Sequence, residues 1–175
     1  MILSTARLSI RELVEDDAPF IVELLNDPAF IQYVGDKGVR TLDEGREYIK
    51  SGPRAMYAEF GFGLWLVQLP DRTPIGMCGL LKRAVLDDVD LGFALMPQFR
   101  REGYTFEAAS AVMGYARDRL RLDRLVAIVN PDNDASAKLL QRLGFTFEEQ
   151  RTVFPGAAPL NLFATSLKRG HSTLR

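Results

Sequence analysis

One ten-residue turn constrains this chain more than any other feature of its sequence. It runs Phe99–Ala108 (FRREGYTFEA), follows a strand-like segment at 90–96 and opens an apolar helical stretch that reaches Leu120. The first backbone N–H groups of a helix have no partner inside the helix, and the helix dipole favours an anion beside them. A basic turn with a glycine at this point is therefore suited to hold a phosphate group.

The composition indicates an ordinary globular protein. The 175 residues suit one domain, and 47% are apolar and 26% charged. A formal net charge of −1 gives no reason to expect a nucleic acid or a membrane as partner. With one cysteine (Cys78, expected in the core) and one histidine (His171, in a polar tail), we expect no disulfide, no metal site and no Ser-His-Asp triad. We expect a cytoplasmic protein, because neither a signal pattern nor a membrane-length apolar run is seen.

Hydrophobic periodicity predicts an α/β (α+β) protein, in which a mixed, mostly antiparallel central sheet carries helices on both faces. One domain is expected over residues 1–168, with a disordered tail at 169–175. Residues 29–40 are predicted to form a loop, and Thr41 to Glu44 form a capping box. The expected strands are 3–13, 62–69, 74–82, 89–95, 124–129, 145–154 and 160–167, and the expected helices are 17–25, 41–49, 104–120 and 133–143.

Two further motifs follow the turn. Asn130–Ser136 (NPDNDAS) comes after a strand-like segment, and a Leu-Gly-Phe step occupies 143–145. With the turn Arg100–Thr105, their order and spacing resemble the GNAT acyl-CoA N-acetyltransferases, in particular the branch typified by ribosomal-protein N-terminal acetyltransferases. That family uses an Arg/Gln-x-x-Gly-x-Gly/Ala turn to bind the coenzyme A pyrophosphate. The resemblance extends from Arg7 to about Leu167.

The resemblance implies an enzyme that moves an acetyl group from acetyl-CoA to a primary amine by direct attack in a ternary complex. The acceptor would be a small molecule or a protein N-terminus, and the chain a monomer or homodimer. Two central strands would splay apart to admit the pantetheine arm. The alternative is a CoA-binding or structural domain of the same fold that has lost catalysis. It rests on Arg101 and Thr105, where the family favours small residues, and on Leu140, where many members carry a tyrosine acid.

The resemblance also assigns the cofactor-binding residues. Backbone groups of a strand end would contact the thioester and pantetheine, the turn would hold the pyrophosphate, and the next helix would bind the pantetheine amides. These residues are Phe93, Ala94 and Leu95; Arg100, Arg101, Glu102, Gly103, Tyr104 and Thr105; and Asn133 and Ser136. Asn133 also suits a simple helix cap. A proline at position 103 is expected to remove one donor at modest structural cost.

Acyl transfer from a thioester needs a group that accepts the amine proton and a donor for the leaving thiolate. Ser136 is the expected substitute for the missing tyrosine. Asp90 is the expected base, with Glu107 as a second candidate. Tyr33 and the segment 31–40 are expected to contact the acceptor.

Overall fold

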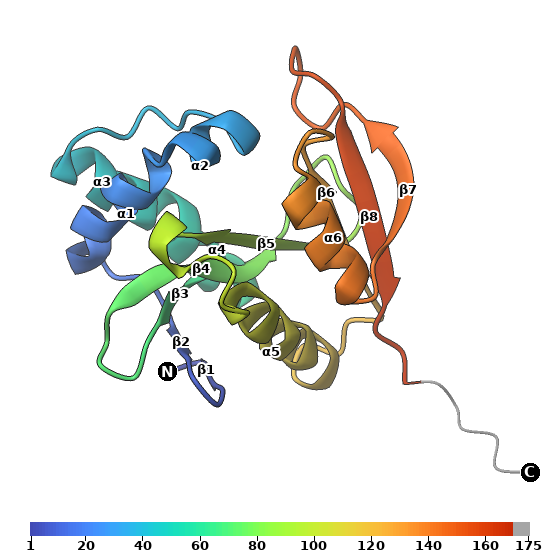
Figure 1. Cartoon of the computed structure of the whole chain (residues 1–175), viewed down its shortest axis with the longest axis horizontal. Coiled ribbons are helices and arrows are strands. Elements are labelled where there is room, and N and C mark those ends of the chain that lie inside the picture. Colours follow the sequence, from blue (N-terminus) through green and yellow to red (C-terminus); the bar gives the residue numbers. More distant parts are fainter. Residues whose placement is uncertain (170–175) are drawn as a thin grey trace, which may run out of the picture.

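A continuous eight-stranded sheet forms the frame of the computed structural model, which describes residues 1–169 (Figure 1). The strand order is β1-β2-β3-β4-β5-β6-β8-β7, and every neighbouring pair is antiparallel except β5 and β6. The predicted mixed, mostly antiparallel sheet is therefore confirmed. The strands are β1 (Leu3–Ser4), β2 (Ser9–Arg11), β3 (Leu64–Gln68), β4 (Pro74–Leu81), β5 (Asp90–Leu95), β6 (Arg124–Val129), β7 (Thr146–Arg151) and β8 (Leu160–Ser166).

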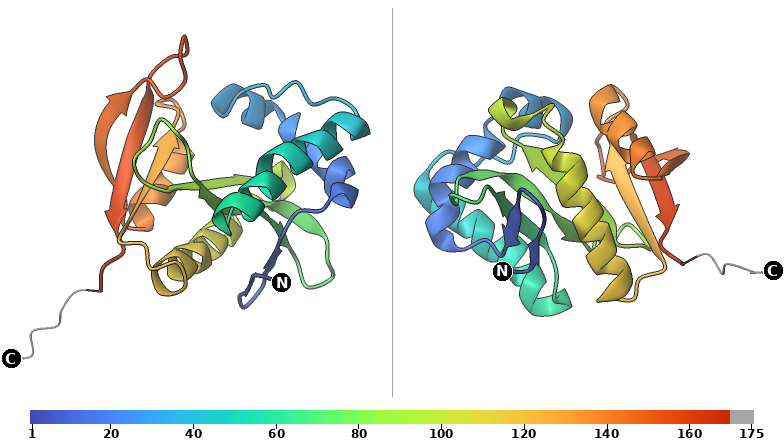
Figure 2. Two further views of the ribbon diagram at one scale, coloured as in Figure 1. Left: turned by 180° about the vertical axis from the view of Figure 1, so that it is seen from behind. Right: turned by 60° about the horizontal axis from the view of Figure 1, so that its bottom comes forward.

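Helices cover both faces of the sheet, as predicted (Figure 2). The first three pack on one face, and α5 and α6 pack on the other. The helices are α1 (Ala18–Leu25), α2 (Pro28–Tyr33), α3 (Leu42–Ile49), α4 (Ala55–Phe60), α5 (Tyr104–Asp118) and α6 (Asp134–Arg142), with short turns η1 (Glu15–Asp17), η2 (Lys50–Arg54) and η3 (Pro97–Phe99).

Alternating side chains of the central strands divide the core into two layers. Leu66 and Met77 pack toward α1 and α3, whereas Trp65 and Cys78 pack toward α5. This division follows from the two-residue period of a strand. Cys78 is 1% exposed, and burial raises the pKa of its thiol to about 12, so it is the core residue that the sequence predicted.

Two predictions for the N-terminal third were wrong. Residues 3–13 form a hairpin instead of one strand, because the Thr5 hydroxyl accepts a hydrogen bond from Leu8 N–H (3.1 Å) and closes a turn. Residues 29–40 are not all loop, because Asp27 caps α2 by accepting from Phe30 N–H (3.2 Å), with Pro28 at the first helical position. The sequence Asn-Asp-Pro therefore ends one helix and starts the next.

The β5 and β6 strands splay apart, as the resemblance implied. They pair only where Asp90 lies opposite Val126, and there the Val126 N–H donates to the Val89 carbonyl (3.0 Å). Beyond this point each strand continues without the other, β5 toward Leu95 and β6 toward Val129. The sheet thus opens next to the turn that precedes α5.

The expected disordered tail lies outside the described residues except for Arg169, whose guanidinium is 3.0 Å from Asp118. Within residues 1–169, no helix combines the length and the apolar character that a membrane crossing requires.

Candidate active site

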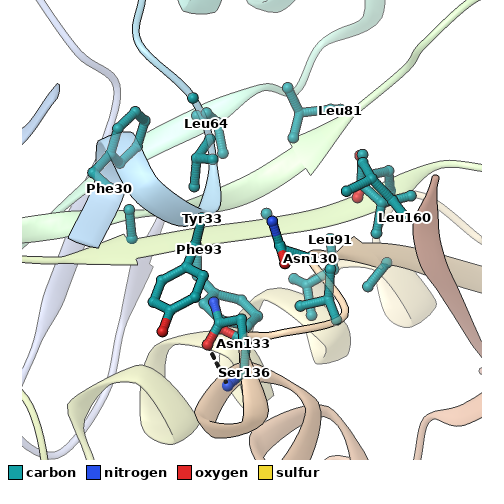
Figure 3. A pocket seen from close by; sticks show the side chains of 18 of the residues that line it. Phe30, Tyr33, Leu64, Leu81, Leu91, Phe93, Asn130, Asn133, Ser136 and Leu160 are labelled. Carbon is teal, nitrogen blue, oxygen red and sulfur yellow. Dashed lines mark hydrogen bonds between the residues drawn. The ribbon is translucent and has the colours of Figure 1, made fainter. Parts of the chain in front are cut away.

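Two pockets meet at the opening between β5 and β6. We call the one beside the turn, of about 490 Å³, the turn pocket, and the other, of about 410 Å³, the inner pocket. Their shared residues form what we call the junction, where side chains of α2, β5 and α6 lie around one space (Figure 3). The junction residues are Phe30, Tyr33, Val34, Phe93, Ala94, Asn133 and Ser136.

The β5 backbone presents free polar groups to this junction. On the β6 side, the Val89 carbonyl accepts a hydrogen bond from Val126 N–H. On the β4 side, Met96 N–H donates to the Ile75 carbonyl (2.8 Å). Because backbone groups alternate sides along a strand, odd-numbered residues of β5 face the gap and even-numbered ones face β4. The N–H and carbonyl of Phe93 therefore point into the gap. Ala94, one of the predicted backbone contacts, turns its polar groups toward β4 and offers only its methyl group to the pockets.

Arg100 has a structural partner. Its Nη2 donates to Asp27 Oδ2 (2.6 Å), and its Nε donates to the Leu95 carbonyl (3.1 Å). Asp27 is 7% exposed, so this ion pair fixes the turn to the start of α2. Arg100 lines the turn pocket, but its charge is already paired. Arg101 lines the same pocket, and none of the described hydrogen bonds or ion pairs uses its side chain.

The turn places α5 amides at the pocket. Gly103 is the N-cap residue with φ +80°, and α5 begins at Tyr104 without a side-chain cap among the described residues. The first N–H groups of α5, including those of Tyr104 and Thr105, are therefore available to an anion. The left-handed backbone also corrects one expectation: proline, fixed near φ −65°, does not fit position 103. Arg101 also has positive φ (+66°), which explains why glycine is common there in the family.

Glu107 secures the turn to the first hairpin. Its carboxylate accepts from the Thr5 hydroxyl (2.6 Å) and from Arg7 Nε (2.7 Å), while Arg7 Nη1 donates to the Glu102 carbonyl (2.9 Å). Partial burial acts to raise the pKa of Glu107, but these bonds outweigh it and lower that pKa. Glu107 lines neither pocket, so the geometry offers it no part in proton transfer.

The turn pocket is positively charged. Four of its lining residues are cationic, and none of its described lining residues is acidic. Two of the cations, Lys138 and Arg142, were not anticipated from sequence. They lie four residues apart on α6, a spacing that places both on one helix face. The Arg142 guanidinium lies 4.6 Å from the ring centroid of Phe106 on α5, which fixes this charge next to the turn. The set comprises Arg100, Arg101, Lys138 and Arg142.

The α6 N-terminus supplies the polar side chains of the junction. Asn133 caps α6 by accepting from Ser136 N–H through Oδ1 (3.2 Å), which leaves its NH₂ group as a donor toward the pockets (Figure 3). The Ser136 hydroxyl has no partner among the described hydrogen bonds, and Ser136 lines both pockets. Leu140, one turn further on, is 1% exposed and gives the inner pocket an apolar wall.

The far end of the inner pocket holds one carboxylate side chain and two cationic side chains. Asp90 is 1% exposed, and its Oδ2 accepts from Arg83 Nε (2.7 Å). Burial raises the pKa of Asp90 to about 6, an effect that the Arg83 charge reduces without cancelling. Lys37 lines the same pocket, and its pKa is lowered, first by loss of surrounding water and second by the nearby Arg83. Lys37 belongs to the segment 31–40 that was expected to contact the acceptor, whereas Arg83 was not singled out by the sequence.

The raised pKa of Asp90 predicts a pH-dependent stability. Between the ordinary aspartate value of 3.8 and about 6, the folded state binds the Asp90 proton more tightly than the unfolded state does. The contribution of Asp90 to folding stability therefore decreases as pH rises through this window and is constant above it. We expect the unfolding free energy of wild type minus that of Asp90→Asn to decrease from pH 4 to pH 6.5 in urea titrations. A difference that is independent of pH would contradict this assignment.

Comparison with known proteins connects this geometry to a family. Residues 7–146 match the family model of the acetyltransferase (GNAT) domain. An uncharacterized N-acetyltransferase of Bacillus subtilis, YoaA, is 29% identical over 149 residues, which cover 84% of each chain. An acetyltransferase structure from Agrobacterium tumefaciens aligns with a TM-score of 0.79 at 26% identity, over 93% of this chain and 92% of that one.

A second similar structure is RimL, a ribosomal-protein α-N-acetyltransferase solved with coenzyme A. It aligns with a TM-score of 0.79 at 19% identity, over 94% of this chain and 97% of that one. The family model covers most of the sequence, and the mixed eight-stranded sheet agrees with the acetyltransferase structures that the chain resembles. The chain belongs to the GNAT family of N-acetyltransferases, enzymes that transfer an acetyl group from acetyl-CoA to an amine.

Proposed function

We propose that the two pockets are the two halves of one active site. Acetyl-CoA occupies the turn pocket, with its diphosphate on the first N–H groups of α5 and close to Arg101, Lys138 and Arg142. Its pantetheine arm runs into the gap between β5 and β6, and its thioester lies at the junction. The acceptor amine enters through the inner pocket. The observation that carries this proposal is that a cationic pocket and a second, mostly apolar pocket meet at the junction, into which the free N–H of Phe93 points.

The reaction then needs little from the protein beyond placement. The amine nitrogen attacks the thioester carbon, the new N–C bond forms, and the C–S bond breaks to release the CoA thiolate. The Phe93 N–H points into the gap, where it polarises the thioester oxygen and stabilises the negative charge that develops on it. Two pockets that meet at one point hold both reactants in the required geometry, which removes much of the entropic barrier.

Two side chains are assigned to proton transfer. The Ser136 hydroxyl forms a hydrogen bond to the leaving thiolate and relays a proton to it from solvent, giving up one proton and taking another from water; Leu140 has no donor for this role. Asp90 accepts the amine proton, and it is ionised above pH 6. Asp90 lies three residues before Phe93 on β5, about 10 Å along the strand at roughly 3.3 Å per residue. The proton therefore reaches Asp90 through bound water instead of by direct contact.

The Ser136 assignment predicts a selective loss of rate. Ser136→Ala should lower kcat about 100-fold or more, because a general acid contributes roughly 10²- to 10⁴-fold. CoA affinity should stay within about twofold, since the Asn133 cap uses the backbone N–H of residue 136. Ser110→Ala, on the exposed side of α5, is the matched control. A kcat equal to wild type would remove Ser136 from the mechanism.

Titration of the protein with CoA tests the proposed function as a whole. Calorimetry should give one CoA bound per chain, and a CoA concentration of one hundred times Kd should stabilise the fold by about 2.7 kcal/mol. An amine panel should then release free CoA from acetyl-CoA. Binding without turnover on any amine would favour the domain that has lost catalysis, and absence of binding would overturn the proposal.

A further inference from the structure

The charges of the inner pocket restrict which amines this enzyme can accept. Its described lining contains Lys37 and Arg83 as cations and a single acid, Asp90. That acid is already bound to Arg83 at 2.7 Å and is nearly inaccessible to solvent. The pocket therefore has a net positive charge at its far end and offers no free carboxylate for a second ammonium group.

Arg83 is held in place, but its guanidinium still has hydrogen-bond donors without a described partner. Of its nitrogens, only Nε makes a described hydrogen bond, so both terminal nitrogens retain donors. Asp90 fixes the guanidinium from one side, and the Phe154 ring lies 5.5 Å from its Cζ. A guanidinium fixed in this way, with free donors facing a pocket, is suited to bind a carboxylate or phosphate in two-point contact.

We propose that the acceptor is a small amine that also carries an anionic group, a carboxylate or a phosphate. Its amine lies at the junction, and its anionic group lies at the far end, where Arg83 and Lys37 bind it. This inference rests on the proposed function and adds the acceptor class to it. Most of the remaining lining is apolar, with walls that include Leu64, Leu81 and Leu160, so an apolar segment between the two groups of the acceptor fits the pocket.

The pocket size agrees with this class. A volume of about 410 Å³ lies near the lower end of the range for small-molecule sites, which is roughly 300–1,000 Å³. A polyamine would place its second ammonium beside Arg83 and Lys37, where like charges repel. A free peptide N-terminus would leave the two cations without a partner unless an acidic side chain followed it.

Three acceptors of equal length separate these cases: 6-aminohexanoate, hexylamine and 1,6-diaminohexane. They share one primary amine and differ only in the far group, which is anionic, neutral or cationic. We expect kcat/KM for 6-aminohexanoate to exceed that for hexylamine by about tenfold or more, as charge-assisted hydrogen bonds allow, with the diamine lowest. 6-Aminohexyl phosphate against 6-aminohexanoate, two acceptors that can both span the pocket, distinguishes phosphate from carboxylate as the preferred anion.

Lys37→Gln tests the pocket without disturbing the core, because Lys37 lines the pocket from the protein surface and has no described ion-pair partner. The variant should reduce the preference for 6-aminohexanoate over hexylamine several-fold, mainly through KM. Lys50→Gln, exposed and outside both pockets, is the matched control. Arg83→Lys, which keeps a charge beside Asp90, should reduce the same preference, with thermal unfolding measured to confirm the fold.

A binding readout separates this inference from the proposed function. Thermal shift of the CoA complex with hexanoate, hexylamine or hexanol should show stabilisation by the anion alone. Equal shifts for all three, including no shift, or a preferred acceptor without an anionic group, would overturn the inference. CoA affinity measured on the same samples reports on the proposed function independently of either outcome.

Discussion

Gly76→Ala should lower the unfolding free energy by about 3 kcal/mol, the upper end of the usual cost of overpacking. An added Cβ at this β4 position would lie 2.3 Å from the Ala94 carbonyl oxygen and 3.0 Å from the Leu95 Cα. Both atoms belong to the β5 backbone, which is fixed by its hydrogen-bonded pairing with β4. Because no side chain can rotate away, the two strands must separate where β5 borders the junction. The measurement is urea unfolding of the variant beside wild type.

The matched control is Gly114→Ala in α5. The nearest atom to a Cβ built there, Arg117 Nη2, is 4.0 Å away, and the residue does not have a positive φ. Its unfolding free energy should equal that of wild type or exceed it by up to about 1 kcal/mol, since alanine favours helix. We also expect Gly76→Ala to weaken CoA binding under conditions where it stays folded. A loss below about 0.5 kcal/mol would show that β4 and β5 tolerate a wider spacing, and the shape of the junction would need another explanation.

The second large effect concerns the charge of the turn pocket. The triple variant Arg101→Gln, Lys138→Gln and Arg142→Gln should bind CoA about 100-fold more weakly, if each charge-assisted contact contributes about 1 kcal/mol. Its affinity should also depend less on salt than that of wild type, because screened ionic contacts have been removed. Calorimetry at two salt concentrations measures both quantities. Arg100 is left unchanged because its charge is paired with Asp27.

Arg119→Gln serves as the control for net charge, since Arg119 is exposed at the end of α5 and lines neither pocket. It should bind CoA as wild type does. If the triple variant retains wild-type affinity and salt dependence, phosphate binding does not depend on these three side chains. The uncapped α5 amides would then be the remaining candidates for holding the diphosphate.

The sequence predicted the central and C-terminal fold well because strand and helix periodicities are local properties. The expected strands and helices after residue 62 all appear, with ends shifted by a few residues. The N-terminal third was harder to predict. The hairpin at Thr5 closes through a backbone hydrogen bond from Thr5 N–H to the Leu8 carbonyl and through the Thr5 hydroxyl, contacts that the apolar pattern does not show. The Asn-Asp-Pro sequence ends α1 and also starts α2, so its interpretation as a helix stop alone was incomplete.

At the site, too, residues that are close in sequence could be predicted, whereas contacts between distant segments could not. The turn, Asn133 and Ser136 were found because they are close in sequence and carry a motif. Lys37 lies in the segment 31–40 that was expected to contact the acceptor, whereas Arg83 was not singled out, because only the fold brings the β4–β5 loop to the same pocket. The ion pair of Arg100 was not foreseen for the same reason: its partner Asp27 is 73 residues away. The motif likewise does not show that the φ angle of Gly103 is positive, which is why proline is unsuitable there.

A crystal structure of the chain with CoA would show directly whether the cofactor occupies the turn pocket. We expect the diphosphate on the amides of Tyr104 and Thr105, the pantetheine arm in the gap between β5 and β6, and the sulfur at the junction between Phe93 and Ser136. A diphosphate elsewhere, or a sulfur that does not reach the junction, would contradict the division of the site into a turn pocket for CoA and an inner pocket for the acceptor.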